Sequence, residues 1–134
     1  MAKGYDQHIE RKNKVNSFGK ELTRRAKSKC ELCEATGVSL SVFEVPPVKE
    51  EPEVERCIFI CDECKNKLER VKKAKENDFR FLTNSIWSEA DMIRALSIKL
   101  LTEMATKYSW AELVLDDLYI DESTEELIKT IELE

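Results

Sequence analysis

The segment Cys57-Ile-Phe-Ile-Cys61-Asp-Glu-Cys64 leads a short apolar run directly into a Cys-x-x-Cys motif, and it decides the fold. A matching motif, Cys30-Glu-Leu-Cys33, comes earlier, and 27 residues separate Cys33 from Cys61. In a reducing compartment such paired motifs are metal ligands more often than disulfides, because two of them bring four thiolates around one ion. We therefore predict one structural zinc ion (Zn2+) held by Cys30, Cys33, Cys61 and Cys64. A redox pair of motifs and an iron site are the alternatives.

The residues between and after the cysteines predict a hairpin followed by a helix. Leu40-Ser-Val-Phe-Glu-Val45 alternates in part, as a half-buried strand does, and Pro46-Pro47 ends it. Residues 57–60 form a second strand with Cys57 buried, and residues 62–75 are rich in helix formers. The predicted class is therefore α+β: a treble-clef-like zinc module of knuckle, β-hairpin and helix, followed by a mostly α-helical C-terminal half.

The charge pattern suggests three parts: a flexible basic arm (1–16), a zinc-binding module with a leading basic helix (17–80) and a helical extension packed on it (81–134). Residues 1–29 hold nine Lys and Arg against three acidic residues. A helix from Ser17 to about Lys27 would project Lys20, Arg24 and Lys27 outward. Together with Arg25 these side chains could grip phosphates, or they could form only a solvated face.

The C-terminal half shows three helix starts with capping-box spacing. The pairs are Ser88 with Asp91, Ser109 with Glu112, and Ser123 with Glu126. Trp87 and Trp110 are interpreted as core anchors of these helices. Residues 116–134 hold eight acidic residues against a single lysine, so the chain is basic first and acidic last.

Bulk composition narrows the function classes. The net charge is −5, and no apolar run reaches the about 20 residues that a membrane span needs. With no secretory signal at the N-terminus, we expect a cytoplasmic protein without membrane contact. The single histidine, His8, lies in the predicted arm, and the sequence has no glycine-rich phosphate loop. These patterns predict a protein that is not an enzyme.

Five strings in order carry a resemblance to a family. They are Lys29-Cys-Glu-Leu-Cys33, Leu40-Ser-Val-Phe-Glu-Val-Pro-Pro47, Ile60-Cys-Asp-Glu-Cys64, Leu82-Thr-Asn-Ser-Ile-Trp-Ser-Glu89 and the stretch 110–122. Together they resemble the N-terminal zinc-binding region of the longer PhnA-type proteins, which are named for an alkylphosphonate-utilisation operon. The resemblance implies that the four cysteines bind zinc. It also implies that this chain lacks the family's SH3-like C-terminal domain, or that another chain supplies it. It implies no hydrolase activity.

The motif layout also resembles the zinc-stabilised scaffold of HNH nucleases. The strand at 42–45 and the helix at 65–68 contain no histidine, so the scaffold would be shared without the chemistry. Three function classes stay open: a non-catalytic zinc module that mediates protein contacts, a nucleic-acid binder using the basic helix, and an enzyme linked to phosphonate metabolism. Redox sensing by the cysteines is a smaller fourth alternative.

Overall fold

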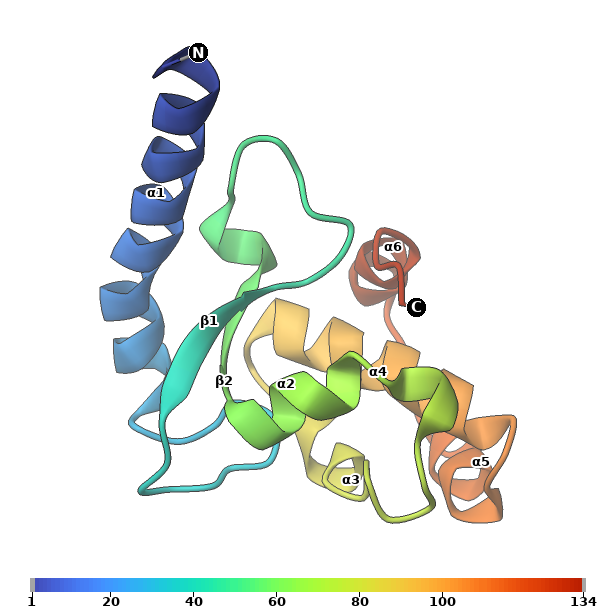
Figure 1. Ribbon diagram of the computed structural model, residues 1–134. Helices are drawn as coiled ribbons and strands as arrows, with labels where there is room; N and C mark the ends of the chain where they lie inside the picture. The colour runs from blue at the N-terminus through green and yellow to red at the C-terminus, as the bar shows by residue number, and fades with distance from the viewer. Residues whose placement is uncertain (1, 134) are drawn as a thin grey trace.

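The computed structural model describes the backbone of residues 2–133 and the side chains of residues 9–133. Two strands and six α-helices make up this part of the chain (Figure 1). In chain order they are α1 (Ala2–Ala26), β1 (Leu40–Glu44), β2 (Cys57–Cys61), α2 (Asp62–Leu68), α3 (Leu82–Ser85), α4 (Asp91–Ala105), α5 (Ser109–Asp116) and α6 (Glu122–Lys129). Short 3-10 turns lie at Val54–Arg56 and Val71–Lys73.

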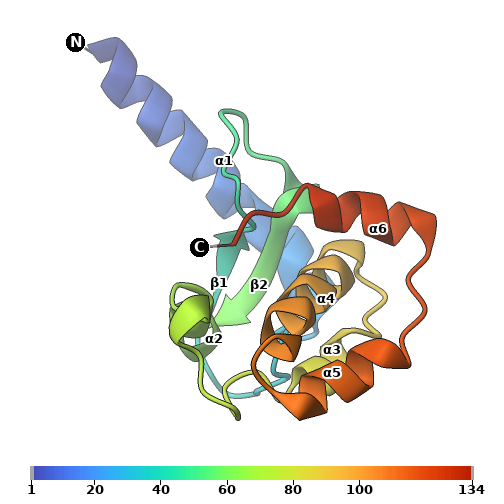
Figure 2. The ribbon, with the colours of Figure 1, turned by 90° about the vertical axis from the view of Figure 1, so that its right-hand side faces the viewer.

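The two strands form the predicted antiparallel hairpin. Leu40 pairs with Cys61 at one end of the sheet, and Glu44 pairs with Cys57 at the other. Helix α1 packs against both strands, while α4 contacts β2 from the opposite side (Figure 2). Because β2 is covered in this way, four of its five residues are buried, whereas β1 is half-buried throughout.

Helix α4 is the centre of the core. Nine of its residues are buried, and Leu96, Leu100, Leu101 and Met104 are fully inaccessible. A helix with most of its residues buried needs neighbours on most of its surface, and Figure 2 shows α3, α5 and α6 arranged around α4. The buried cluster is continuous from Cys30 to Ile131, so the cysteine region and the C-terminal helices share one core.

Helix α1 is much longer than the sequence indicated. The prediction that it begins near Ser17 was wrong, because the structure has helix from Ala2 to Ala26. Most of the segment 1–16, expected to be a flexible arm, therefore belongs to this helix. Ser17 lies inside it and donates its hydroxyl to the carbonyl of Lys14 at 2.6 Å, instead of capping a start. Ion pairs of Arg11 with Glu44 and of Lys14 with Glu51 hold this part of α1 against the hairpin and its loop.

The three C-terminal helices are confirmed, but their predicted capping boxes are wrong. The N-cap residues are Ala90, Tyr108 and Asp121, and of these Asp121 alone accepts a capping bond, from the Thr124 amide at 2.8 Å. Ser88 instead accepts a bond from the Ala90 amide. The helices start where their apolar faces meet the core, and this packing overrides the serine signals.

Two further expectations need correction. The helix predicted over 62–75 ends at Leu68, and a 3-10 turn follows a break at Arg70, whose φ is −132° and ψ 41°. Trp87 is 67% exposed and is not a core anchor, because its neighbour Ile86 takes the inward position instead. Trp110 is half-buried against the core, with the Arg80 guanidinium 4.8 Å from its ring centroid.

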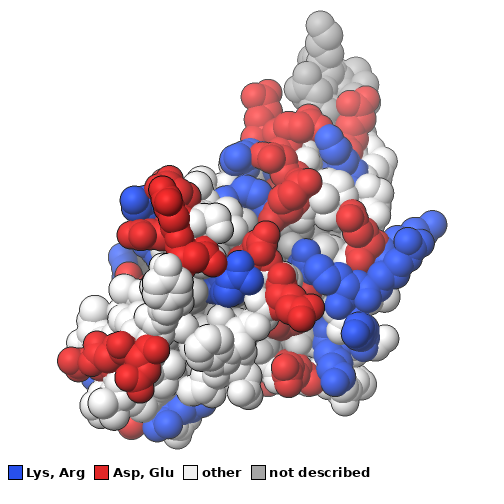
Figure 3. Space-filling view, turned by 180° about the vertical axis from the view of Figure 1, so that it is seen from behind, with Lys and Arg blue, Asp and Glu red and all other residues white. Residues whose placement is uncertain are grey.

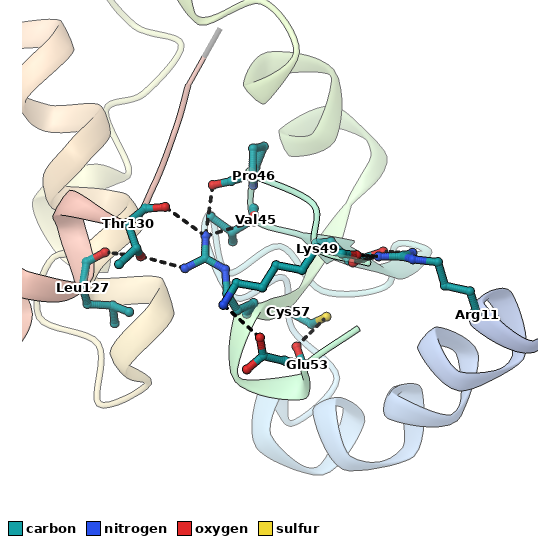
Figure 4. Close-up of polar contacts among 10 residues, drawn as sticks. Arg11, Val45, Pro46, Lys49, Glu53, Cys57, Leu127 and Thr130 are labelled. Carbon is teal, nitrogen blue, oxygen red and sulfur yellow. Dashed lines mark hydrogen bonds and ion pairs between the residues drawn. The ribbon is translucent and has the colours of Figure 1, made fainter. Parts of the chain in front are cut away.

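A buried arginine ties the last helix to the hairpin. Arg56, 8% exposed, donates to the Thr130 hydroxyl at 2.7 Å and to the Pro46 and Val45 carbonyls at 3.0 and 3.2 Å. Figure 4 shows Val45, Pro46 and Thr130 gathered around this one guanidinium. The Pro46 carbonyl also accepts the amide of Glu132, so the C-terminal segment lies against the end of β1.

None of the helices within residues 2–133 combines the length and the apolar character that crossing a membrane requires.

Candidate metal centre

The structure brings the four predicted cysteines together. Their sulfur atoms all lie within 4.8 Å of one another, and the Cys30–Cys64 and Cys33–Cys61 pairs are each separated by 3.7 Å. A tetrahedral zinc with Zn–S bonds of about 2.3 Å sets its sulfurs about 3.8 Å apart. A disulfide would need about 2.05 Å, and all five cysteines are free thiols here. The four cysteines could therefore hold a metal ion, and their chemistry and spacing fit zinc.

The first ligand pair lies in a tight turn, as the knuckle prediction required. The Cys30 amide donates to the Ala35 carbonyl at 3.0 Å, and the Glu34 amide donates to the Cys30 carbonyl at 2.9 Å. Glu34 has a positive φ of 65°, and an isolated β-bridge between Lys29 and Thr36 closes the turn. Two successive backbone bonds thus turn the chain back on itself, which points both sulfurs to the same side.

The second ligand pair lies where strand β2 becomes helix α2. Cys61 is the last residue of β2 and the N-cap residue of α2, and Cys64 lies in the first turn of the helix. The Cys61 amide approaches the sulfur of Cys30 at 3.4 Å, which links the two motifs directly. Cys30, Cys61 and Cys64 are 1%, 4% and 1% exposed, whereas Cys33 is only partly buried.

The neighbouring sulfurs change one another's pKa values. The hydrogen bond between Cys30 and Cys64, together with backbone amides, lowers the pKa of Cys30 to about 4. The same bond raises the pKa of Cys64 well above its ordinary value, and burial raises that of Cys33 to about 11. The protein alone thus favours the thiolate of Cys30 and the protonated thiols of Cys33 and Cys64. A cation is needed to hold all four in the ionised form that binds metal.

Glu31, inside the first motif, is a site residue that sequence reasoning missed. Its side chain is 6% exposed and accepts two bonds of 2.7 Å from Arg25 and one of 2.8 Å from the Phe59 amide. The Glu31 amide in turn donates to the Phe59 carbonyl at 3.0 Å. Through this carboxylate the knuckle, strand β2 and the end of α1 are joined, and the bond to Glu31 raises the pKa of Arg25.

The structure separates the four basic residues predicted to act together. Lys20, Arg24 and Lys27 are exposed, and Figure 3 shows basic side chains gathered at the right of the rear face, below the grey end of α1. Arg25 instead donates to Glu31 and, at 3.1 Å, to the Cys57 carbonyl. Three of the four residues are therefore available to a ligand, and the fourth holds the fold together.

Other reactive groups lie apart from the cluster. Glu44 is at the far end of the hairpin from Cys61, and both its carboxylate oxygens accept from Arg11, at 2.7 and 2.6 Å. Cys57 is fully buried, as predicted, and its thiol contacts the Glu53 carbonyl at 3.4 Å (Figure 4). The side chain of His8 lies outside the described residues.

No protein-family model, curated protein or solved structure matches this chain significantly. The interpretation of the metal centre therefore depends on its own geometry.

Proposed function

We propose that this protein is a non-catalytic zinc-binding module of the PhnA type, built as a treble clef around one structural zinc ion in the cytoplasm. The observation that carries the proposal is the gathering of four sulfurs within 4.8 Å of one another, from a knuckle and a strand–helix junction, with two of the pairs at 3.7 Å. That distribution of ligands, two in a turn and two at the start of a helix after a hairpin, supports the treble-clef assignment.

The donor set favours a structural role for the metal. Catalytic zinc sites keep one coordination position open for water or substrate, whereas four cysteine thiolates fill all positions. Three of the four cysteines are also almost completely buried, which leaves a reactant little access to the ion. The metal would instead connect the knuckle, the hairpin and α2, none of which is long enough to be stable alone.

A protein partner is the proposed target of the C-terminal half. Large apolar side chains on this half are exposed: Trp87 at 67%, Leu113 at 68% and Tyr119 at 86%. Aromatic side chains are enriched at protein interfaces, because they provide contact area at a low cost in conformational entropy. A second candidate function, nucleic-acid binding by α1, draws support from the exposed Lys20, Arg24 and Lys27.

Metal analysis tests the main proposal. We expect about one zinc per chain in protein purified without added metal, and loss of helical circular dichroism after chelation, because the metal would connect the short elements around it. Cys33→Ser should lose zinc, while Cys57→Ser should retain it, since Cys57 lies outside the cluster. Metal-free protein with an unchanged fold, or zinc retained equally by both variants, would refute the proposal.

A further inference from the structure

The chain that follows helix α2 is strongly basic in an acidic protein. Residues 65–80 contain seven Lys and Arg against three Asp and Glu, a local charge of +4, whereas the whole chain carries −5. This segment leaves α2 at Leu68, breaks at Arg70 and makes the 3-10 turn Val71–Lys73. It lies outside both the cysteine cluster and the basic part of α1.

The break and the turn create a hollow lined mainly by cations. Its volume is about 230 Å³, and its lining residues are Lys67, Arg70, Lys73, Lys75 and Asp78. A second hollow of the same volume shares Arg70 and Lys73 and adds Glu69, Val71 and Lys72. Two basic hollows therefore lie next to each other, with Arg70 and Lys73 between them.

The cations of the first hollow are largely available. Within residues 9–133 no carboxylate lies within ion-pair distance of Arg70, Lys73 or Lys75. Arg70 uses only its Nε, in a weak 3.5 Å contact with the Asn66 carbonyl, so both terminal nitrogens of its guanidinium stay available. The one acid in the lining, Asp78, accepts the Lys75 amide at 2.9 Å and so is directed toward the backbone.

This arrangement contrasts with other arginines of the molecule. Arg11, Arg25 and Arg94 each pair with a carboxylate of the same chain, at 2.6, 2.7 and 3.1 Å. In the first hollow Lys67 pairs with Glu63 at 3.4 Å, which leaves Arg70, Lys73 and Lys75 without an acidic partner among the described residues. Three such clustered cations repel each other, which disfavours folding unless an anion compensates them. A guanidinium fork beside lysine ammonium groups matches the oxygens of a phosphate.

We propose that the hollow formed by Lys67, Arg70, Lys73 and Lys75 is a phosphate-binding site, and that its ligand is the phosphate backbone of a nucleic acid strand. The neighbouring hollows around Arg70 and Lys73 suit more than one phosphate along a chain. The nearby rings of Phe81 and Trp110 are covered by Lys67 and Arg80, and among the described residues no aromatic side chain lines either hollow. Binding should therefore involve the backbone without base stacking, and should be independent of sequence.

The test measures binding of a fluorescent oligo-dT strand to the zinc-replete full chain by anisotropy, across a range of salt concentrations. Arg70→Ala/Lys73→Ala is compared with Lys49→Ala/Lys129→Ala, which removes the same charge from exposed positions outside both hollows and outside α1. Losing two phosphate contacts should lower the magnitude of the salt slope by about 1.4 and weaken binding about 25-fold at about 0.1 M salt. The control pair should bind like the natural chain, and circular dichroism should show that both variants fold.

A parallel titration with inorganic phosphate, followed by amide NMR shifts over residues 67–78, separates the possible sources of the phosphate. Shifts that vanish in Arg70→Ala/Lys73→Ala, without oligo-dT binding, would support the site but assign it to a small phosphate compound. Equal losses in the two variant pairs would show charge attraction without a site and would overturn the proposal. Binding lost only in the control pair, or no response to either probe, would overturn it as well.

Discussion

Replacing Arg25 by alanine tests how the metal centre is supported. Arg25 lies at the end of α1, yet it donates two bonds to Glu31 within the first cysteine motif and one to the carbonyl of Cys57 on β2. In Arg25→Ala the Glu31 carboxylate would stay buried with only the Phe59 amide as a partner. A buried carboxylate that loses its cation destabilises the folded state.

The size of the effect follows from burial. Removing one partner of a fully buried ion pair costs about 3–5 kcal/mol, and removing one of an exposed pair costs about 1 kcal/mol or less. The side chain of Glu31 is 6% exposed and that of Arg25 35%, so this pair lies between these limits, at about 2 kcal/mol. For a chain of this length, that loss lowers the melting temperature by about 7 °C.

The assay is thermal unfolding of zinc-replete protein, followed by circular dichroism, with Arg24→Ala as the matched control. Arg24 is exposed, so its replacement should change stability by less than about 0.5 kcal/mol. Adding Glu31→Gln to Arg25→Ala should cost less than the sum of the single changes, because the two residues act as a pair. Equal melting temperatures for Arg25→Ala and Arg24→Ala would refute the reasoning, and so would strict additivity.

Three further predictions concern the core and the buried polar groups. Arg56→Ala should lower the free energy of unfolding, measured by chemical denaturation, by about 2–4 kcal/mol, because it leaves the Val45 carbonyl and Thr130 without their buried donor. A decrease no greater than that of Arg24→Ala would show that Arg56 does not connect the last helix to the hairpin. Leu96→Ala, at a fully buried position of α4, should cost about 2–5 kcal/mol, and a change below 1 kcal/mol would contradict the central place of α4. Burial raises the pKa of Cys57 from 9.0 to about 11, so the thiol stays protonated in the folded chain while the unfolded chain ionises first. The stability of the natural chain relative to Cys57→Val should therefore fall as the pH rises from about 9 to about 11; a difference that is constant with pH would argue against this shift.

The sequence predicted the clustering of the four cysteines and the hairpin well, because both depend on local patterns. A Cys-x-x-Cys turn needs only its own residues, and the apolar runs at 40–45 and 57–60 match the two strands to within one residue. The contacts that support the site were not predictable in this way. Glu31 accepts a hydrogen bond from Phe59, 28 residues away, and Arg56 donates one to Thr130, 74 residues away. No local sequence pattern indicates either contact.

Helix boundaries were the weaker part of the prediction. Ser88, Ser109 and Ser123 all have the spacing of a capping box, yet the N-caps fall at Ala90, Tyr108 and Asp121. A capping bond contributes about 1 kcal/mol, whereas burying one leucine contributes about 2–3 kcal/mol, so packing against α4 decides the boundaries. The extension of α1 before Ser17 similarly depends on tertiary ion pairs, with Glu44 and Glu51.

Cys61 is at once a ligand candidate, the residue paired with Leu40, and the residue before α2. A two-stranded sheet this short is marginally stable and open to slippage, and a slip by one residue reverses which side chains face inward. Such a slip would also carry the sulfur of Cys61 to the opposite face, away from the other three. A bound ion would therefore select the strand register during folding, because all four sulfurs can bind it only when Leu40 pairs with Cys61.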